Sequence, residues 1–164
     1  MAVYQYCTPE WFEELEKRYR QDSTNAKQLN NLTLVLCFRV QANSSWGIDR
    51  DMIFGARLNG GSLVRLGLFS EEEAAGDATF VLSAAPEDWK RLLRRESSLV
   101  TEFMLGRVKL EKGSRIAILK LAPLSDKLIN FMRSAEIQFP DEMSADEFER
   151  YRTYMEKVRV KLGV

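Results

Sequence analysis

A run of strict two-residue alternation near the N-terminal end limits what this chain can fold into. Between Leu32 and Ala42 every second residue is apolar, and the residues between them include Thr33, Arg39 and Gln41. Side chains of a β-strand point alternately to the two faces of a sheet, so this run predicts a long strand with one fully apolar face. Such a face has to be buried beneath a layer of other elements.

Four further strands are predicted downstream of the first. Residues 46–58 and 62–69 alternate in the same way, and the sequence Asn-Gly-Gly at 59–61 between them is typical of a tight hairpin turn. The first three strands therefore form an antiparallel meander. Residues 78–84 and 107–111 add two short apolar or alternating runs, which gives five strands in all.

The covering layer is predicted from apolar residues at helical spacing. Helices over residues 9–21 and 144–162 both begin at typical N-terminal signals, a Thr-Pro pair and a capping box. Three more helical segments follow Pro86, end at Gly106 and follow Pro123.

The remaining segments are less regular. Residues 22–31 are polar and predicted to form a loop, and residues 70–77 are predicted to form a charged connection. Residues 115–121 fit either a strand or a helix. The whole chain, residues 1–164, is thus predicted to be a single α+β domain, with a mainly antiparallel sheet that helices cover on one face.

Composition excludes several classes of function. The chain contains no histidine, so Ser-His-Asp and Cys-His nucleophilic sites are impossible. Lys and Arg number 24, as do Asp and Glu, and a neutral chain is a poor match for the phosphate backbone of nucleic acids. Cys7 and Cys37 lack the spacing of a zinc site. We therefore predict no catalysis, no metal, no cofactor and no nucleic-acid partner.

The middle of the chain contains four short motifs in a particular order. Residues 77–79 read Asp-Ala-Thr, 87–89 read Glu-Asp-Trp, 106–111 read Gly-Arg-Val-Lys-Leu-Glu, and 120–124 read Lys-Leu-Ala-Pro-Leu. In this order the sequence resembles the sterol carrier protein 2 lipid-transfer family, over about residues 32–133. The resemblance implies a five-stranded sheet with helices on one side and an apolar tunnel between them. It also makes residues 115–122 a helix.

The resemblance implies what the tunnel holds and where the protein works. A fatty acid, an acyl thioester, a sterol-like lipid or a quinone-like lipid would be bound and carried without reaction. No secretory signal and no membrane-spanning run is visible, and residues 161–164 are not a Ser-Lys-Leu address, so we expect a bacterial-type, stand-alone member in the cytoplasm. The helices over 9–21 and 144–162 are extra to the minimal domain; they can plug the cavity mouth, form a dimer surface or pack on the open face of the sheet.

The ligand would lie against apolar side chains of the helices and of the strands that face them. The candidate cavity residues are Trp89, Leu92, Phe103, Met104, Ile118, Leu121, Leu124, Leu128, Phe131 and Met132. A solid core needs the same residue types as a tunnel, so spacing alone leaves both interpretations open.

Basic side chains are candidates for contacts outside the cavity. The possible head-group anchors are Arg39, Arg50, Arg107 and Lys120. The cluster of Lys90, Arg91, Arg94 and Arg95 can meet an anionic membrane surface transiently or form the solvated face of a helix.

Two other functions remain open alongside the carrier. The chain can be an accessory subunit that presents a hydrophobic acyl or aryl intermediate to a partner enzyme. Alternatively, it can be a structural module with a filled cavity, which forms a homodimer through the aromatic stripes of its terminal helices.

Overall fold

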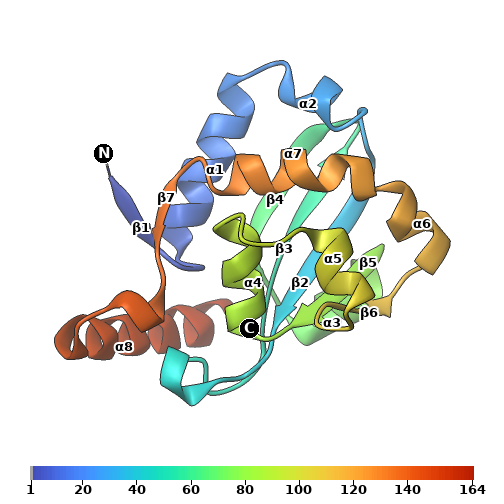
Figure 1. Cartoon of the computed structure of the whole chain (residues 1–164). Coiled ribbons are helices and arrows are strands. Elements are labelled where there is room, and N and C mark those ends of the chain that lie inside the picture. Colours follow the sequence, from blue (N-terminus) through green and yellow to red (C-terminus); the bar gives the residue numbers. More distant parts are fainter. Residues whose placement is uncertain (1) are drawn as a thin grey trace.

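The first predicted strand lies at the centre of the main sheet. In the computed structural model, which describes residues 2–164, β2 (Leu34–Val40) pairs antiparallel with β3 (Met52–Asn59) and parallel with β5 (Phe80–Ala84). Outside them lie β4 (Ser62–Phe69) and β6 (Lys109–Lys112), which gives the order β4-β3-β2-β5-β6 (Figure 1). The predicted five-stranded, mainly antiparallel sheet is confirmed, with the β2–β5 pair as its parallel step.

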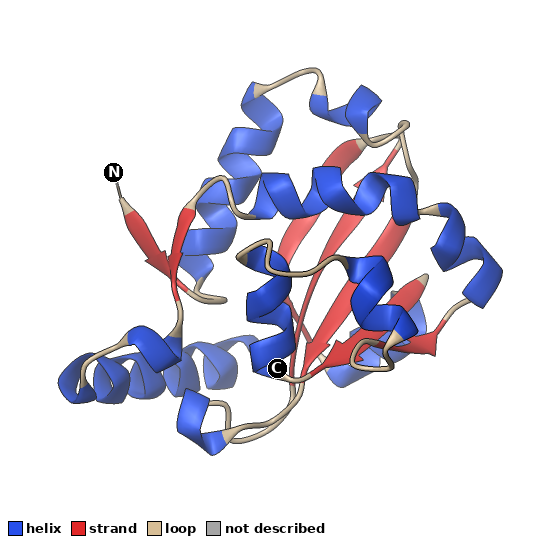
Figure 2. Ribbon diagram, viewed as in Figure 1, coloured by secondary structure: helices blue, strands red, loops and turns tan. Residues whose placement is uncertain are grey.

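A layer of helices covers one face of this sheet (Figures 1 and 2). The ambiguous segment after β6 is helical, as the family resemblance implied. The helix predicted over residues 9–21 has those bounds, and its N-cap residue Thr8 accepts a hydrogen bond from the Trp11 backbone N–H at 3.4 Å. The layer consists of α1 (Pro9–Gln21), α4 (Pro86–Leu93), α5 (Leu99–Met104), α6 (Arg115–Lys120) and α7 (Ala122–Met132).

The opposite face is partly covered by a helix that the sequence did not predict. Residues 70–77, expected to be a loop, form α3 (Glu71–Asp77). Ser70 and Glu73 make a reciprocal capping box, and three acidic residues in the first turn suit the positive end of the helix dipole. Ala74 of α3 then packs over Cys37 and Val81 of the sheet. The negative charges of this segment had masked a helix start.

Two other predicted boundaries were wrong for local reasons. β3 begins at Met52 rather than at residue 46, because Ser44–Trp46 form the 3₁₀ turn η1 and Gly47 adopts a left-handed φ of 73°. The turn places the Trp46 ring edge-on to Tyr6 and Phe139. Within the predicted loop 22–31, α2 (Asn25–Gln28) makes a single helical turn.

The two ends of the chain come together beside the main sheet. β1 (Val3–Gln5) pairs in parallel with β7 (Glu136–Gln138), followed by the 3₁₀ turn η2 (Pro140–Glu142) and α8 (Ala145–Leu162). Tyr151 of α8 donates a hydrogen bond to the Tyr6 carbonyl at 2.6 Å. Both terminal segments therefore extend the core of the domain.

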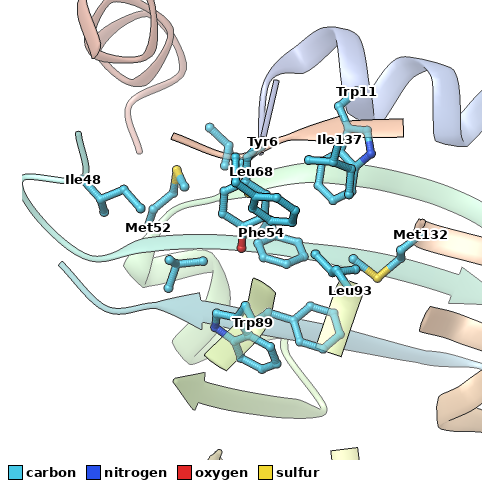
Figure 3. Packing of buried hydrophobic residues seen from close by; sticks show 14 of the residues in the cluster. Tyr6, Trp11, Ile48, Met52, Phe54, Leu68, Trp89, Leu93, Met132 and Ile137 are labelled. Carbon is cyan, nitrogen blue, oxygen red and sulfur yellow. The ribbon is translucent and has the colours of Figure 1, made fainter. Parts of the chain in front are cut away.

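Aromatic rings fill the part of the core between these ends and the sheet. Phe54 stacks on Phe38 with ring centroids 5.0 Å apart, and Tyr6 and Trp11 meet it at 6.4 and 6.3 Å (Figure 3). Offset and edge-on pairs of this kind stabilise a core beyond the area that they bury. This aromatic cluster forms a firm support next to the region described below.

The turn between β6 and α6 requires glycine. Gly113 has a φ of 110°, and an added Cβ would lie 2.4 Å from Phe80 Cδ1 and 2.7 Å from the Thr79 carbonyl oxygen. We expect Gly113→Ala to lower the free energy of unfolding by about 2–5 kcal/mol, from backbone strain plus overpacking, in urea denaturation.

Gly106→Ala is the matched control for this substitution. Gly106 also has a positive φ, of 78°, but an added Cβ would meet nothing within 4 Å. Gly106→Ala should lower the free energy of unfolding by about 1–2 kcal/mol, which is the backbone-strain contribution alone. Equal losses for the two variants would contradict the proposed clash with Phe80.

A buried carboxylate fixes α5 to its surroundings. The Glu102 side chain is fully buried; it accepts a hydrogen bond from Arg107 Nη2 at 3.0 Å and lies 3.6 Å from Arg91 Nε. The hydrogen bond from Arg107 holds the pKa of Glu102 below its ordinary value. Because the pKa is lowered on folding, the stability this group contributes is present above the pKa of the unfolded chain and lost as the pH falls through the folded value.

We therefore expect Glu102→Gln to lower the free energy of unfolding at neutral pH by about 1.5–3 kcal/mol. The difference from wild type should shrink below about pH 4, where the carboxylate of the unfolded chain is protonated. Glu14→Gln removes an i,i+4 pair with Arg18 and should change the stability little, because solvent screens this pair. A loss at Glu102 that does not change with pH would contradict the assigned ion pair.

Candidate functional site

An apolar cavity of about 90 Å³ lies between the sheet and α7. The strands supply its floor through side chains that share the helix-covered face of the sheet. On β2 and β3 these are Leu34, Leu36, Phe38, Phe54, Ala56 and Leu58, and on β4 and β5 they are Leu63, Leu66 and Leu82. The alternation that predicted β2 therefore also placed Leu34, Leu36 and Phe38 against the cavity.

The roof of the cavity comes from α6 and α7. Six of the ten residues predicted from the sequence line it: Ile118, Leu121, Leu124, Leu128, Phe131 and Met132. α7 crosses over the strands of the sheet (Figure 1), and its residues Leu128, Phe131 and Met132 pack into the hydrophobic core. The role of the six residues toward a ligand stays a prediction.

The other four predicted residues lie elsewhere. Trp89 and Leu92 of α4 line an adjoining void of about 30 Å³. This void and the 90 Å³ cavity share Phe38, Phe54 and Met132 in their linings. Phe103 lines a groove of about 20 Å³ between α5 and α6. Met104 lines none of these three spaces and is 72% exposed, because it lies on the outer side of the short helix α5.

Polar atoms of the cavity lining are already paired with the backbone. The Ser125 hydroxyl donates to the Ala122 carbonyl at 2.6 Å, and the Tyr19 hydroxyl donates to the Gly61 carbonyl. Burial raises the pKa of Tyr19, which keeps this group protonated and able to donate. A carboxylate or another hydrogen-bond acceptor placed inside the cavity would find no free donor among these side chains, and an unpaired buried polar group is costly. The cavity therefore suits only the apolar part of a molecule.

The N-terminal helix closes one end of the cavity. Tyr19 on α1 meets the Phe131 ring edge-on, with centroids 5.4 Å apart, and its hydrogen bond reaches the turn at Gly61. α1 packs along β4 within the helix-covered layer. Sequence reasoning missed Tyr19, although its position in the apolar stripe of the helix over 9–21 marked it as buried. Of the predicted roles for the terminal helices, α1 thus contributes to the cavity wall, whereas α8 does not line it.

Three of the four predicted head-group anchors are held away from the cavity. Arg39 lies on the opposite face of the sheet and pairs with Glu71 and Glu111, both at 2.9 Å. Arg107 binds Glu102, and Arg50 donates to the Val164 carbonyl. The fourth anchor, Lys120, is exposed on α6.

Three of the four cations in the basic cluster at residues 90–95 are paired with carboxylates. Lys90 pairs with Asp141 at 2.9 Å, Arg94 with Glu142 at 2.7 Å, and Arg91 with Asp88. The partners of Lys90 and Arg94 lie about fifty residues away in the sequence, so the cluster looked uncompensated when only its own helix was considered. The fourth, Arg95, is exposed and donates a hydrogen bond to the Asn130 side chain, so most of the charge of this cluster is compensated.

Other kinds of site find no support in the described part of the chain. Within residues 2–164, no three His, Cys, Asp or Glu side chains converge in a way that could hold a metal ion. No helix in the same range combines the length and apolar character that crossing a bilayer requires. Cys7 and Cys37 are both buried and unbridged, and the carboxylates Asp49 and Asp51 lie on Arg152 and Arg39.

Solved structures with the same fold include several sterol carrier proteins. A crystal structure of sterol carrier protein 2 superposes with a TM-score of 0.70 at 18% identity, over 80% of this chain and 99% of that one. A solution structure of a protein from Thermus thermophilus gives 0.71 at 17% identity, over 84% and 94%. Sterol carrier protein 2 from Yarrowia lipolytica gives 0.56 at 14% identity, over 76% and 88%.

Comparison of sequences identifies the family. None of the curated proteins matches the chain. The model of the SCP-2 sterol transfer family, however, matches residues 12–126, from the first turn of α1 into α7. This range contains every strand of the main sheet and three of the six predicted roof residues, and it is well over half of the sequence. The chain therefore belongs to the SCP-2 sterol transfer family.

Proposed function

We propose that this protein binds a lipid or a similar hydrophobic small molecule in the cavity between its sheet and α7, and carries it without chemical change. The observation that carries the proposal is the lining of the cavity, whose two polar side chains are both paired with backbone carbonyls. Membership of a sterol transfer family and the sterol carrier proteins among the similar structures support the same ligand class.

Burial of apolar surface provides the energy for binding. Each methylene removed from water contributes about 0.8 kcal/mol. Filling an existing 90 Å³ void recovers a further amount, on the order of 2 kcal/mol, because the surrounding side chains regain packing partners. A carboxylate or phosphate head group stays outside the cavity, since the lining offers it no free hydrogen-bond donor. Fatty acids, acyl thioesters, and sterol-like or quinone-like lipids meet these requirements.

The size of the cavity implies movement during binding. Pockets that hold drug-sized molecules measure roughly 300–1,000 Å³, well above 90 Å³. A long-chain lipid therefore requires the roof to move away from the sheet. α6 and α7 are the elements that can do so, because they face the sheet across the void and lose packing contacts there.

The side chains around the cavity support a carrier that leaves its ligand chemically unchanged. The lining contains no carboxylate, lysine, cysteine or histidine, and the Ser125 hydroxyl has no base beside it. Nothing there can transfer a proton or form a covalent intermediate at neutral pH. This composition supports a carrier rather than an enzyme.

Filling the cavity should abolish binding. Ala56 lies on the cavity floor in β3, and Ala56→Phe would place a ring in the void. We expect the affinity for a fluorescent fatty acid to fall at least tenfold, because the ring occupies the volume in which several methylenes of the ligand would be buried. Titration of delipidated protein with the probe measures the change.

Val64→Phe is the matched control for Ala56→Phe. Val64 lies on the neighbouring strand β4, is 53% exposed and does not line the cavity. This variant should bind the probe as the wild type does, and thermal denaturation of both variants would report any loss of folding. If neither the wild type nor the control binds the probe saturably, the carrier function is refuted.

Movement of the roof can be followed by hydrogen exchange. In the free protein we expect faster amide exchange in α6 and α7 than in β2 and β3, because the roof borders the void on its packed side. A saturating fatty acid should slow exchange in α6 and α7 and leave α8, which does not line the cavity, unchanged. Uniform slowing over the whole chain would contradict local opening.

A further inference from the structure

Exposed apolar side chains gather on two short helices at one edge of the molecule. Among residues 2–164, nine large apolar side chains are exposed, and five of these lie on α5, its C-cap and α6. Met104 and Ile116 are 72% and 70% exposed, which is unusual for residues of their size. The five, named here the α5–α6 patch, are Val100, Met104, Leu105, Ile116 and Leu119.

The two helices that carry the patch are neighbours in space. Phe103 of α5 and Leu119 of α6 line the same groove, and the Arg115 guanidinium lies 4.9 Å from the centre of the Phe103 ring. In Figure 1 both helices lie at the β6 edge of the sheet, away from α8. The patch is thus one surface and not two separate ones.

The groove beneath the patch leads to the cavity. Leu82, Leu99 and Ile118 line both the groove and the 90 Å³ cavity. A small separation of α5 from α6 would therefore connect the cavity with the apolar surface outside. The connection passes only apolar side chains, which suits a lipid chain.

The charges around the patch are positive and uncompensated. Arg115 and Lys120, at the two ends of α6, are exposed, and in the described chain no carboxylate lies within ion-pair distance of either. α6 itself contains no acidic residue. On α5 the acidic residue, Glu102, is buried and paired with Arg107. The cluster at residues 90–95 differs, because three of its four cations are paired with carboxylates.

We propose that the α5–α6 patch docks on an anionic lipid bilayer, and that the carried molecule enters and leaves between α5 and α6. The proposal rests on the carrier function for the ligand that passes. Two features match the bilayer: apolar side chains that can enter the interface, and cations beside them that can lie on phosphate head groups. The patch is small and has only two free cations, so docking is brief and depends on anionic lipid.

Two double variants remove the two features separately. R115Q/K120Q removes the charge and I116N/L119N removes the apolar contact; all four side chains are exposed, so the fold should tolerate the changes. The matched controls on α8 are K157Q/K161Q and V160N/L162N, which change equally exposed side chains on a helix that lines neither the groove nor the cavity.

Binding is measured by co-sedimentation with vesicles of phosphatidylcholine containing about 30 mol% phosphatidylserine, against vesicles of phosphatidylcholine alone. The wild type should bind the anionic vesicles more tightly. R115Q/K120Q should weaken this binding on the order of 30-fold, from the loss of two cations near the surface. I116N/L119N should weaken it at least tenfold and slow transfer of a fluorescent fatty acid to the vesicles, and the α8 variants should behave as the wild type.

A titration of each variant with the fatty acid, without vesicles, separates this proposal from the carrier function. Normal probe binding together with no preference for anionic vesicles would overturn docking and leave the carrier function intact. Equal effects of the patch variants and the α8 variants would overturn it as well. Docking without any probe binding would refute the carrier function and the passage between α5 and α6. A wild-type dimer that I116N/L119N dissociates in sedimentation would assign the patch to a second copy of the chain instead.

Discussion

The structure depends on how the apolar face of one sheet is buried. β2 lies in the middle of that sheet, and its alternating residues require cover along their whole length. The aromatic cluster around Phe54 covers one part by filling it with interlocking rings. The aliphatic floor beside it, with Leu36 and Ala56, is covered by α7 across a void. One face thus provides both a rigid support and an adaptable space.

This division places an apolar space next to a closely packed support. Close packing leaves few voids in most protein interiors, and each void costs the dispersion contacts that its lining lacks. An apolar molecule that fills such a void restores these contacts. The α1 helix bounds the space through Tyr19, whose hydroxyl donates to the carbonyl of Gly61. In the carrier function proposed above, the space would therefore expand toward α6 and α7 rather than toward α1.

Charge is distributed so that most ionic groups are used within the fold. Arg39 joins α3 and β6 on the far face of the sheet, and Lys90 and Arg94 join α4 to η2. Glu102 fixes α5 from below while the outer side of that helix stays apolar. Arg115 and Lys120 lie on a helix with no acidic residue, beside exposed apolar side chains of α5 and α6. A protein with no net formal charge thus has a cationic, apolar surface next to its cavity.

The sequence by itself determined most of the elements, the five-stranded sheet and the family. Two-residue alternation placed β2 and β4, and helical spacing placed α1 and α7, because both periods are properties of neighbouring residues. It failed at α3, where a charged run concealed a capping box, and it named neither Tyr19 nor the individual floor residues of the strands. Only the tertiary structure decided whether apolar residues leave a void, since that depends on how side chains from distant elements fill a shared volume. It also decided which charges are free, because Lys90 meets Asp141 only after the chain has folded.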